Sequence, residues 1–268
     1  MTGLLEHLAS SDAVVRFEVR GGHTALVTLN RPNARNAVSV EMANTMETIV
    51  DATEADPAIR SVVLASSHPD VFCAGADLKE VHAGRGDKLF TERNGFAGLV
   101  FSDRTKPWIA AVNGKALAGG CELALACDMV VASTQAAFGL PEVLRGLVAA
   151  AGGMYRLPRV LPPNIALEMI TTALPLGGER AYALGMVNRL VAADQVLDEA
   201  LLLASQIAAN APLAVRESLR VARAAFAQNE AQLRAITREA RATVFASNDY
   251  KEGPLAFIEK RKPRWTGT

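Results

Sequence analysis

Cysteine is scarce in this sequence of 268 residues, which contains only Cys73, Cys121 and Cys127. An odd number of cysteines without the spacing of metal ligands argues against a disulfide framework and favours a reducing compartment. The four histidines do not cluster with metal-ligand spacing either. We therefore predict a protein without a disulfide framework and without a metal site.

Net charge of one sign is also absent, because 28 Lys and Arg residues balance 28 Asp and Glu residues. This balance argues against a general nucleic-acid-binding protein. No apolar run approaches the roughly 18 residues of a membrane-spanning helix, since Glu122 and Asp128 interrupt the most apolar stretch. Residues 1–12 lack the basic and apolar regions of a signal peptide. We expect a soluble, cytoplasmic protein with no nucleic-acid partner and no membrane partner.

The composition is that of a globular protein, with 50% hydrophobic and 21% charged residues. At roughly 150 residues per domain, the length allows one or two domains with a sizeable core. Aromatic residues make up only 5%, whereas alanine is abundant. Because alanine is the best helix former, this composition favours many close-packed helices with small side chains.

The N-terminal part alternates between strand and helix patterns. Two β-rich runs, residues 14–19 and 25–30, flank Gly21 and Gly22 and predict a hairpin. Ser39 is a suitable N-cap for a helix that reaches about residue 55. Further short apolar strands are predicted at residues 61–65, 108–112, 129–132 and 186–191. Short buried strands separated by helices predict a core sheet that is covered by helices.

Residues 89–101 have a weaker helical pattern, because Gly95 and Gly98 each cost about 1 kcal/mol relative to alanine in a helix. We expect this segment to form a mobile helix that covers a pocket.

The chain becomes almost wholly helical after about residue 160. Pro163 suits the first turn of a helix at residues 164–172, and Asp194 is the expected cap of a helix at residues 195–209. Two more helices are predicted near residues 213–227 and 230–246. We therefore divide the chain into a core of residues 1–195 and a helical region of residues 196–268.

Residues 72–79 and 112–123 each combine small residues with a turn from a strand into a helix. In the first motif, free backbone N–H groups near Gly75 could face an anion. The alternative is an ordinary turn that Asp77 caps. In the second motif, a helix beginning near Gly119 would present free N–H groups and its positive dipole end to an oxyanion. Glu122 lies in the first turn of that helix, where an acid can also simply complement the dipole.

Glu142 follows Pro141 on a predicted loop amid apolar neighbours, and partial desolvation there would raise its pKa. If Glu122 and Glu142 converge on one cavity, the pair suits acid–base chemistry on a water and a carbon. The alternative is that Glu142 is a surface residue on a turn. The basic tail at residues 257–264 is either a solvated face or a site for a ligand that carries several phosphates.

Together and in this order, these motifs resemble the crotonase (enoyl-CoA hydratase/isomerase) superfamily. The resemblance runs from residues 29–32 to residues 259–261 and is closest at residues 73–78 and 113–128. It implies an α/β fold, a crotonase-like spiral of repeated ββα units, followed by a helical C-terminal trimerisation region. It also implies an acyl-CoA thioester substrate, no cofactor beyond the coenzyme A of that substrate, and a homotrimer or a dimer of trimers.

The resemblance also implies roles for individual residues. The backbone N–H groups of Ala76 and Gly119 would form the oxyanion hole for the thioester carbonyl. Glu122 would activate the water that adds at Cβ, and Glu142 would exchange the proton at Cα. Contacts with coenzyme A are implied for Arg35, Ala37, Ala74, Gly75, Asp77, Leu78, Lys79 and, from a neighbouring subunit, Lys260.

The presence of both glutamates favours hydration or dehydration over isomerisation alone. Our leading prediction is an enoyl-CoA hydratase in fatty-acid or related acyl-CoA catabolism. Such an enzyme adds water reversibly, with syn geometry, to a trans-2-enoyl-CoA and gives a 3-hydroxyacyl-CoA. One alternative is another crotonase reaction on a CoA thioester, either carnitinyl-CoA-type dehydration or enoyl-CoA isomerisation. A more distant alternative is a non-catalytic relative that binds acyl-CoA or RNA.

The sequence departs from the hydratase pattern at three alanines. Ala118 stands where a glycine is common, and Ala149 and Ala150 stand where a proline and a glycine are common. Because the second departure borders the expected acyl pocket, it bears on which acyl group the protein accepts.

Overall fold

The computed structural model of the protein describes residue 10 and residues 12–268. The segment in which we expect no signal peptide, residues 1–12, therefore lies mostly outside the described residues. Among the helices that are described, none is both long enough and apolar enough to cross a membrane.

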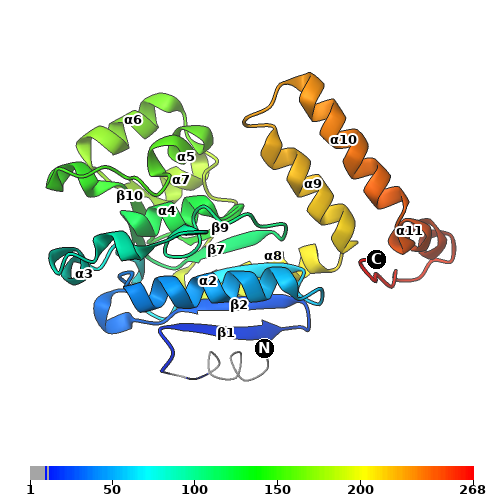
Figure 1. Ribbon diagram of the computed structural model, residues 1–268, viewed down its shortest axis with the longest axis horizontal. Coiled ribbons are helices and arrows are strands. Elements are labelled where there is room, and N and C mark those ends of the chain that lie inside the picture. The colour runs from blue at the N-terminus through cyan, green and yellow to red at the C-terminus, as the bar shows by residue number, and fades with distance from the viewer. Residues whose placement is uncertain (1–9, 11) are drawn as a thin grey trace.

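Six strands form the larger sheet of the core (Figure 1). Their order across the sheet is β1 (Val15–Arg20), β2 (Thr24–Leu29), β3 (Ser61–Ser66), β7 (Trp108–Val112), β9 (Met129–Ser133) and β12 (Arg189–Val191). β1 and β2 form the antiparallel hairpin predicted around Gly21 and Gly22, and the later strands pair in parallel. The predicted strands are confirmed to within a residue, except that β12 begins at Arg189 rather than at residue 186.

The smaller sheet gives the core its repeated pattern. Its strands are, in order, β11 (Leu176–Gly177), β10 (Ala137–Gly139), β8 (Lys115–Leu117) and β4 (Val71–Cys73). Three times in succession the chain passes from the larger sheet to the smaller sheet and then into a helix. The units are β3, β4 and α3 (Leu78–His82), then β7, β8 and α4 (Gly119–Ala126), then β9, β10 and α5 (Gly153–Val160). Each unit lies one strand further along both sheets, which produces the expected spiral of ββα units.

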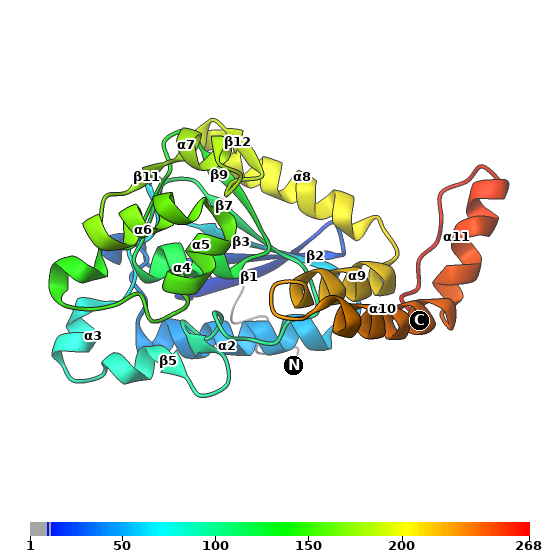
Figure 2. The same cartoon turned by 90° about the horizontal axis from the view of Figure 1, so that it is seen from above.

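Both faces of the larger sheet are covered, as a parallel sheet requires. Alternate residues of a strand point to opposite faces, so Val63 of β3 and Ile109 of β7 pack against α8 (Val196–Ala208). Leu64, the next residue of β3, joins the main core cluster with Met42 and Met46 of α2 (Val40–Ala55). Figure 2 shows α2 and α8 on opposite sides of this sheet.

One predicted helix cap is confirmed and another is wrong. Ser39 Oγ accepts a hydrogen bond from the Met42 N–H at 3.2 Å, so Ser39 caps α2 as predicted. Asp194 does not cap α8. It lies inside a short 3₁₀ turn, η4 (Ala193–Gln195), which moves the start of α8 to Val196 and leaves the helix without a side-chain cap.

Residues 89–101 do not form the helix that we expected. The chain here contains a 3₁₀ turn, η2 (Gly86–Leu89), and a ribbon of β5 (Phe90–Thr91) and β6 (Gly95–Phe96). Gly95 and Gly98 have φ angles of 68° and 65°, which a right-handed helix excludes. A Cβ on Gly98 would lie 2.2 Å from the Ala43 carbonyl oxygen, so this segment packs tightly on α2. The two glycines are therefore required by the turns of this segment.

A helical arm, defined as residues 212–268, extends from the core (Figures 1 and 2). Its helices are α9 (Pro212–Ala224), α10 (Glu230–Phe245) and α11 (Asn248–Ile258), and they follow α6 (Pro163–Thr172), α7 (Gly178–Ala183) and α8 in the chain. α8 still packs on the larger sheet, so the part that extends from the core begins with α9. A domain boundary at residue 195 stays a prediction.

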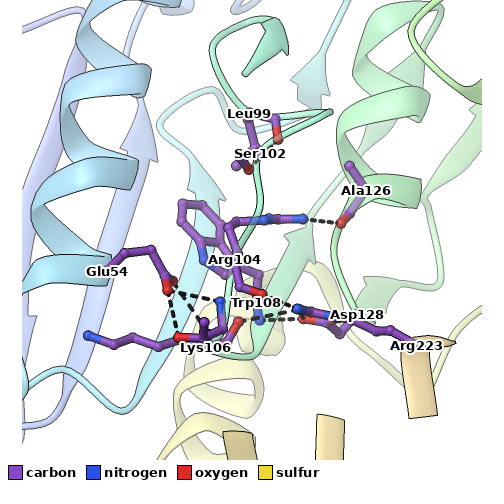
Figure 3. Close-up of polar contacts among 10 residues, drawn as sticks. Glu54, Leu99, Ser102, Arg104, Lys106, Trp108, Ala126, Asp128 and Arg223 are labelled. Carbon is purple, nitrogen blue, oxygen red and sulfur yellow. Dashed lines mark hydrogen bonds and ion pairs between the residues drawn. The ribbon is translucent and has the colours of Figure 1, made fainter. Parts of the chain in front are cut away.

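Arg223 anchors α9 to the core (Figure 3). Its Nε and Nη2 donate to the two carboxylate oxygens of Asp128, each at 2.8 Å, in a bidentate ion pair. Its Nη1 donates to the Arg104 carbonyl, and the Asp128 carboxylate also accepts the Trp108 N–H at 2.8 Å. One guanidinium therefore joins the arm to the beginning of β7 and to the residue that precedes β9.

Arg223→Ala should lower the free energy of unfolding by about 2 kcal/mol, because it leaves the mostly buried Asp128 carboxylate without its charged partner. Arg220→Ala, one turn earlier, is the matched control. It removes a more exposed guanidinium paired with Glu217, a contact worth less than about 1 kcal/mol. Urea unfolding followed by circular dichroism measures both losses. Equal losses would contradict the anchoring role of Arg223.

Candidate active site

The carboxyl ends of three parallel strands of the smaller sheet, β4, β8 and β10, lie side by side. Ala76 follows β4, Gly119 follows β8 and Glu142 follows β10, each within three residues of the end of its strand. The carboxyl edge of parallel strands is where open α/β sheets bind ligands. Consecutive units of the spiral therefore bring these three groups to one edge.

A cavity of about 550 Å³ lies at this edge. Eight of the residues singled out in the sequence line it, namely Arg35, Ala37, Ala74, Ala76, Leu78, Gly119, Glu122 and Glu142. The rest of the wall is mainly apolar and comes from the β5–β6 ribbon, from the turn between β8 and α4, and from η3 (Pro141–Arg145) with the loop after it. Glu122 and Glu142 therefore converge on one cavity, a point that their spacing in the sequence left open.

Two backbone N–H groups at this cavity have no backbone acceptor among the described residues. Ala76 forms a parallel β-bridge with Val38. The hydrogen bonds of this bridge run from the Val38 N–H to the Gly75 carbonyl and from the Asp77 N–H to the Val38 carbonyl, so they do not use the Ala76 N–H. Gly119 is the first residue of α4, and the N–H groups of a first helical turn have no partner within the helix. Both amides are available to a ligand oxygen.

The two amides are close together because the backbones of two loops touch. A Cβ on Gly75 would lie 3.0 Å from the Gly119 nitrogen and 2.8 Å from the Ala118 Cβ, and Gly75 has a φ of 92°. Ala118 has a φ of 53° and a ψ of −130°, a conformation that a residue with a Cβ rarely adopts. The structure thus tolerates backbone strain at the turn that delivers the Gly119 amide.

Glu122 is buried beneath the cavity, with only 3% of its surface exposed. Its Oε1 accepts a hydrogen bond from the Gly153 N–H at 2.9 Å. Burial raises the pKa of Glu122 to about 7, the Gly153 hydrogen bond opposes this shift, and the nearby Glu142 carboxylate adds to it. Glu122 can therefore exchange a proton near neutral pH.

Glu142 lies on η3 rather than on an irregular loop. Burial raises the pKa of Glu142 above its ordinary value, and the charge of Arg145 opposes the shift. Its Oε2 is buried and has no hydrogen-bond partner among the described residues. The cavity therefore holds two proton-exchanging carboxyl groups beside two free amides, an arrangement that can bind a carbonyl oxygen and move protons at the neighbouring carbons.

The remaining predicted site residues have other positions. Asp77 caps α3 by accepting the Lys79 N–H at 3.1 Å, and its carboxylate pairs with Arg31 at 3.0 Å, as the capping alternative predicted. Neither Lys79 nor Lys260 lines the cavity. Lys260 follows α11 on the arm, at the opposite end of the molecule from α3 (Figures 1 and 2).

The sequence did not identify Gly153 as the partner of Glu122. Gly152 and Gly153 precede and begin α5, much as Gly119 and Gly120 begin α4, so a Gly-Gly pair at the start of a helix is the signal that was missed.

The loop that departs from the hydratase pattern does border the cavity. Ala150 lines it, while Ala149 is buried behind it.

A larger cavity of about 850 Å³ lies between the β1–β2 turn, α8 and the arm. Its wall includes Arg20, His23, Arg60 and Lys262 but none of the predicted site residues and no carboxylate. Acid–base chemistry by paired carboxyl groups therefore belongs to the smaller cavity. In the part of the chain that the structure describes, no group of three or more His, Cys, Asp or Glu residues is placed to hold a metal ion.

Ala118→Gly should raise the free energy of unfolding by about 1 kcal/mol, because relief of the strained φ exceeds the extra entropy of glycine in the unfolded chain. Ala124→Gly, in the middle of α4, is the control and should destabilise the protein by about the same amount or more. Urea unfolding measures both changes. A loss of stability in both variants would show that Ala118 is not strained.

Glu122→Gln should remove the part of the pH dependence of the unfolding free energy that comes from titration of Glu122. Because the pKa of Glu122 is about 7 in the folded protein and 4.5 in the unfolded reference, the folded state binds more protons between these values, and stability falls as pH rises through them. The shift corresponds to about 3 kcal/mol. Between pH 4 and pH 8, wild type should therefore lose up to that amount of unfolding free energy through Glu122. E122Q should not lose it, so the difference between E122Q and wild type should shift in favour of E122Q by up to that amount. Parallel pH curves for the two proteins would rule out this shift.

Comparisons with known proteins agree with this geometry. Residues 20–268 match the family described as Enoyl-CoA hydratase/isomerase. The chain is 39% identical over 251 residues to a protein of Proteus mirabilis named carnitinyl-CoA dehydratase, an alignment that covers 92% of this chain and 96% of that protein.

Two solved structures show that the fold is shared. An enoyl-CoA hydratase from Mycobacterium tuberculosis H37Rv is 42% identical and superposes with a TM-score of 0.91, covering 96% of this chain and 100% of that one. A carnitinyl-CoA hydratase from Mycobacterium avium is 40% identical with a TM-score of 0.74, covering 96% and 99%. The expected crotonase-like fold is confirmed, and the chain belongs to the enoyl-CoA hydratase/isomerase family of the crotonase superfamily.

Proposed function

We propose that this protein is an enoyl-CoA hydratase, which adds water reversibly and with syn geometry to a trans-2-enoyl-CoA and gives a 3-hydroxyacyl-CoA. The observation that supports this proposal is the convergence of Glu122 and Glu142 on the cavity that also presents the free amides of Ala76 and Gly119. Hydration requires a polarised thioester carbonyl, an activated water and a proton for Cα. These four groups can supply all three.

The thioester carbonyl oxygen would accept hydrogen bonds from the Ala76 and Gly119 N–H groups. As water adds at Cβ, the electrons of the double bond move toward this oxygen and form an enolate, whose negative charge the amides and the positive end of α4 stabilise. The loss of one such donor typically raises a barrier by about 3 kcal/mol.

The two glutamates would take opposite parts in the proton transfers. Ionised Glu122 takes a proton from the water while the water oxygen bonds to Cβ, and protonated Glu142 gives its proton to Cα. One molecule of water is added in total, and transfer of a proton from Glu122 back to Glu142 restores the starting state. Raised pKa values allow both groups to exchange protons near neutral pH.

Coenzyme A would lie along the backbone at Arg35 and Ala37 and at residues 74–78, with Lys79 and Arg35 near its phosphates. Lys260 is too remote to contribute within one chain (Figures 1 and 2). We therefore propose that Lys260 of the partner subunit meets the phosphates in a homotrimer or a dimer of trimers. Phe257 and Ile258, which are 85% and 74% exposed on the same arm, would be covered by such an assembly.

A second candidate is carnitinyl-CoA-type dehydration, because relatives that are 38% to 39% identical are named carnitinyl-CoA dehydratase. This reaction uses hydration chemistry in reverse on an acyl group that carries a trimethylammonium cation. The charged residues on the cavity wall are Glu122, Glu142, Arg35 and Arg145. Both acids are assigned to proton transfer and the other two groups are cations, so this wall favours an uncharged acyl chain.

The absorbance of the conjugated enoyl thioester tests the proposal directly. Crotonyl-CoA and its analogue with a trimethylammonium group on the γ-carbon are each mixed with the protein. Loss of absorbance with crotonyl-CoA supports the hydratase. Loss with the cationic analogue alone supports the carnitinyl-type reaction, and no loss with crotonyl-CoA or longer enoyl-CoA thioesters refutes the hydratase.

Glu142→Gln should lower kcat for crotonyl-CoA hydration by about 100-fold or more, because general acid catalysis contributes roughly that factor. It should also abolish deuterium exchange at Cα while the dissociation constant for CoA stays within about twofold, since Glu142 belongs to the acyl end of the site. Glu179→Gln, which changes an exposed glutamate of α7, is the control and should leave turnover intact. Unchanged turnover in E142Q would refute its role.

A further inference from the structure

Arg156 of α5 joins two segments that are far apart in the sequence. Its Nη1 donates to the Ala151 carbonyl at 3.0 Å, and its Nη2 donates to the Val100 carbonyl at 2.5 Å. The first carbonyl belongs to the loop before α5 and the second belongs to the turns after β6. A planar guanidinium holds two such acceptors with two different nitrogens in a rigid fork, whereas an ammonium group has a single nitrogen whose donors rotate.

The guanidinium is closely enclosed by its own loop. A Cβ on Gly152 would lie 2.3 Å from Nη1, and Gly152 has a φ of 107°. The rings of Tyr155 and Phe101 lie 5.3 Å and 5.8 Å from the central carbon of the guanidinium. The residue before α5 therefore has to be glycine for the side chain of Arg156 to reach back over the turn.

This loop is the one that binds Glu122. Gly153, two residues after the carbonyl that Arg156 holds, donates its N–H to Glu122 Oε1 at 2.9 Å. The Arg156 N–H also donates to the Gly152 carbonyl at 2.9 Å. The main chain of Arg156 thus holds the peptide group that carries the Gly153 N–H, and its side chain holds the peptide group before it.

The charges around Glu122 give Arg156 a second effect. Glu142, from η3, opposes ionisation of Glu122, whereas Arg156, from α5, favours it. The neighbouring thiols of Cys121 on α4 and Cys73 on β4 are neutral, because burial raises the pKa of each. A positive charge from α5 therefore compensates in part for the second carboxylate.

We propose that Arg156 is a positioning residue for Glu122, because it holds the turn whose Gly153 amide binds the carboxylate that acts as the base. This inference rests on the proposed function of Glu122. Arg156 itself does not line the cavity, so its effect passes through Glu122 and the turn.

Three variants separate geometry from charge. Arg156→Gln should move the acid limb of the kcat/KM profile for crotonyl-CoA about one pH unit higher and lower kcat at pH 7 about tenfold, with KM within twofold. Arg156→Lys keeps the charge but lacks the two-nitrogen fork, so the acid limb should return at least halfway to its wild-type position while kcat at pH 7 stays below that of wild type. Arg159→Gln is the matched control, because Arg159 lies on the same helix over the Tyr155 ring and, within the described part of the chain, its side chain makes no hydrogen bond to the turn. It should leave the acid limb in place.

An unmoved acid limb in R156Q, or an equal movement in R159Q, would overturn the proposal and leave Arg156 a purely structural role. If R156Q does not fold, a wild-type kcat and acid limb in R156K would overturn the positioning step. Infrared difference spectra against E122Q follow protonation of Glu122 without substrate. Failure of wild type to hydrate crotonyl-CoA would refute the proposed function, whereas an infrared titration of Glu122 that is the same with and without Arg156 would refute this inference.

Discussion

Burial of the Glu122 carboxylate is the constraint on which the rest of the cavity depends. The carboxylate lies at a cavity with a mainly apolar wall, an environment that disfavours the ionised form. An isolated carboxylate in such a place would remain protonated. The Gly153 amide and the Arg156 charge reduce this penalty without removing it, since the pKa of Glu122 is still about 7. The balance yields a group that is partly ionised at neutral pH.

Main-chain groups supply most of the other polar functions at the cavity, and this requires backbones to approach one another closely. Gly75 lies against the turn of Ala118, and a Cβ on Gly120 would lie 2.1 Å from the Cys73 carbonyl oxygen. The strained turn at Ala118 and the buried Glu122 both reduce stability. The covered parallel sheet compensates for them. Part of the abundance of small residues therefore has a functional reason, because the site is built largely from backbone amides.

Local signals in the sequence predicted the local structure. The hairpin at Gly21 and Gly22 and the cap at Ser39 depend on neighbouring residues and are present as predicted. Residues 89–101 were predicted wrongly because contact with α2, which comes from a distant part of the chain, decides their conformation. Convergence of Glu122 and Glu142 depends on the pairing of β8 with β10. Strands of three residues carry too little local pattern to predict that pairing.

The register of the smaller sheet aligns the proposed catalytic groups. Ala116 of β8 pairs with Cys73 of β4 on one side and with Phe138 of β10 on the other. A slip of one residue would displace the following amide or Glu142 by about 3.3 Å and turn the strand's side chains to the opposite face. Three-residue strands have few ladder hydrogen bonds with which to resist such a slip. The alternation of exposed Lys115 and buried Ala116 on β8 resists it instead, because a slip would turn the charged Lys115 side chain into the core and Ala116 out of it. Packing of the core and alignment of the site are therefore the same physical requirement.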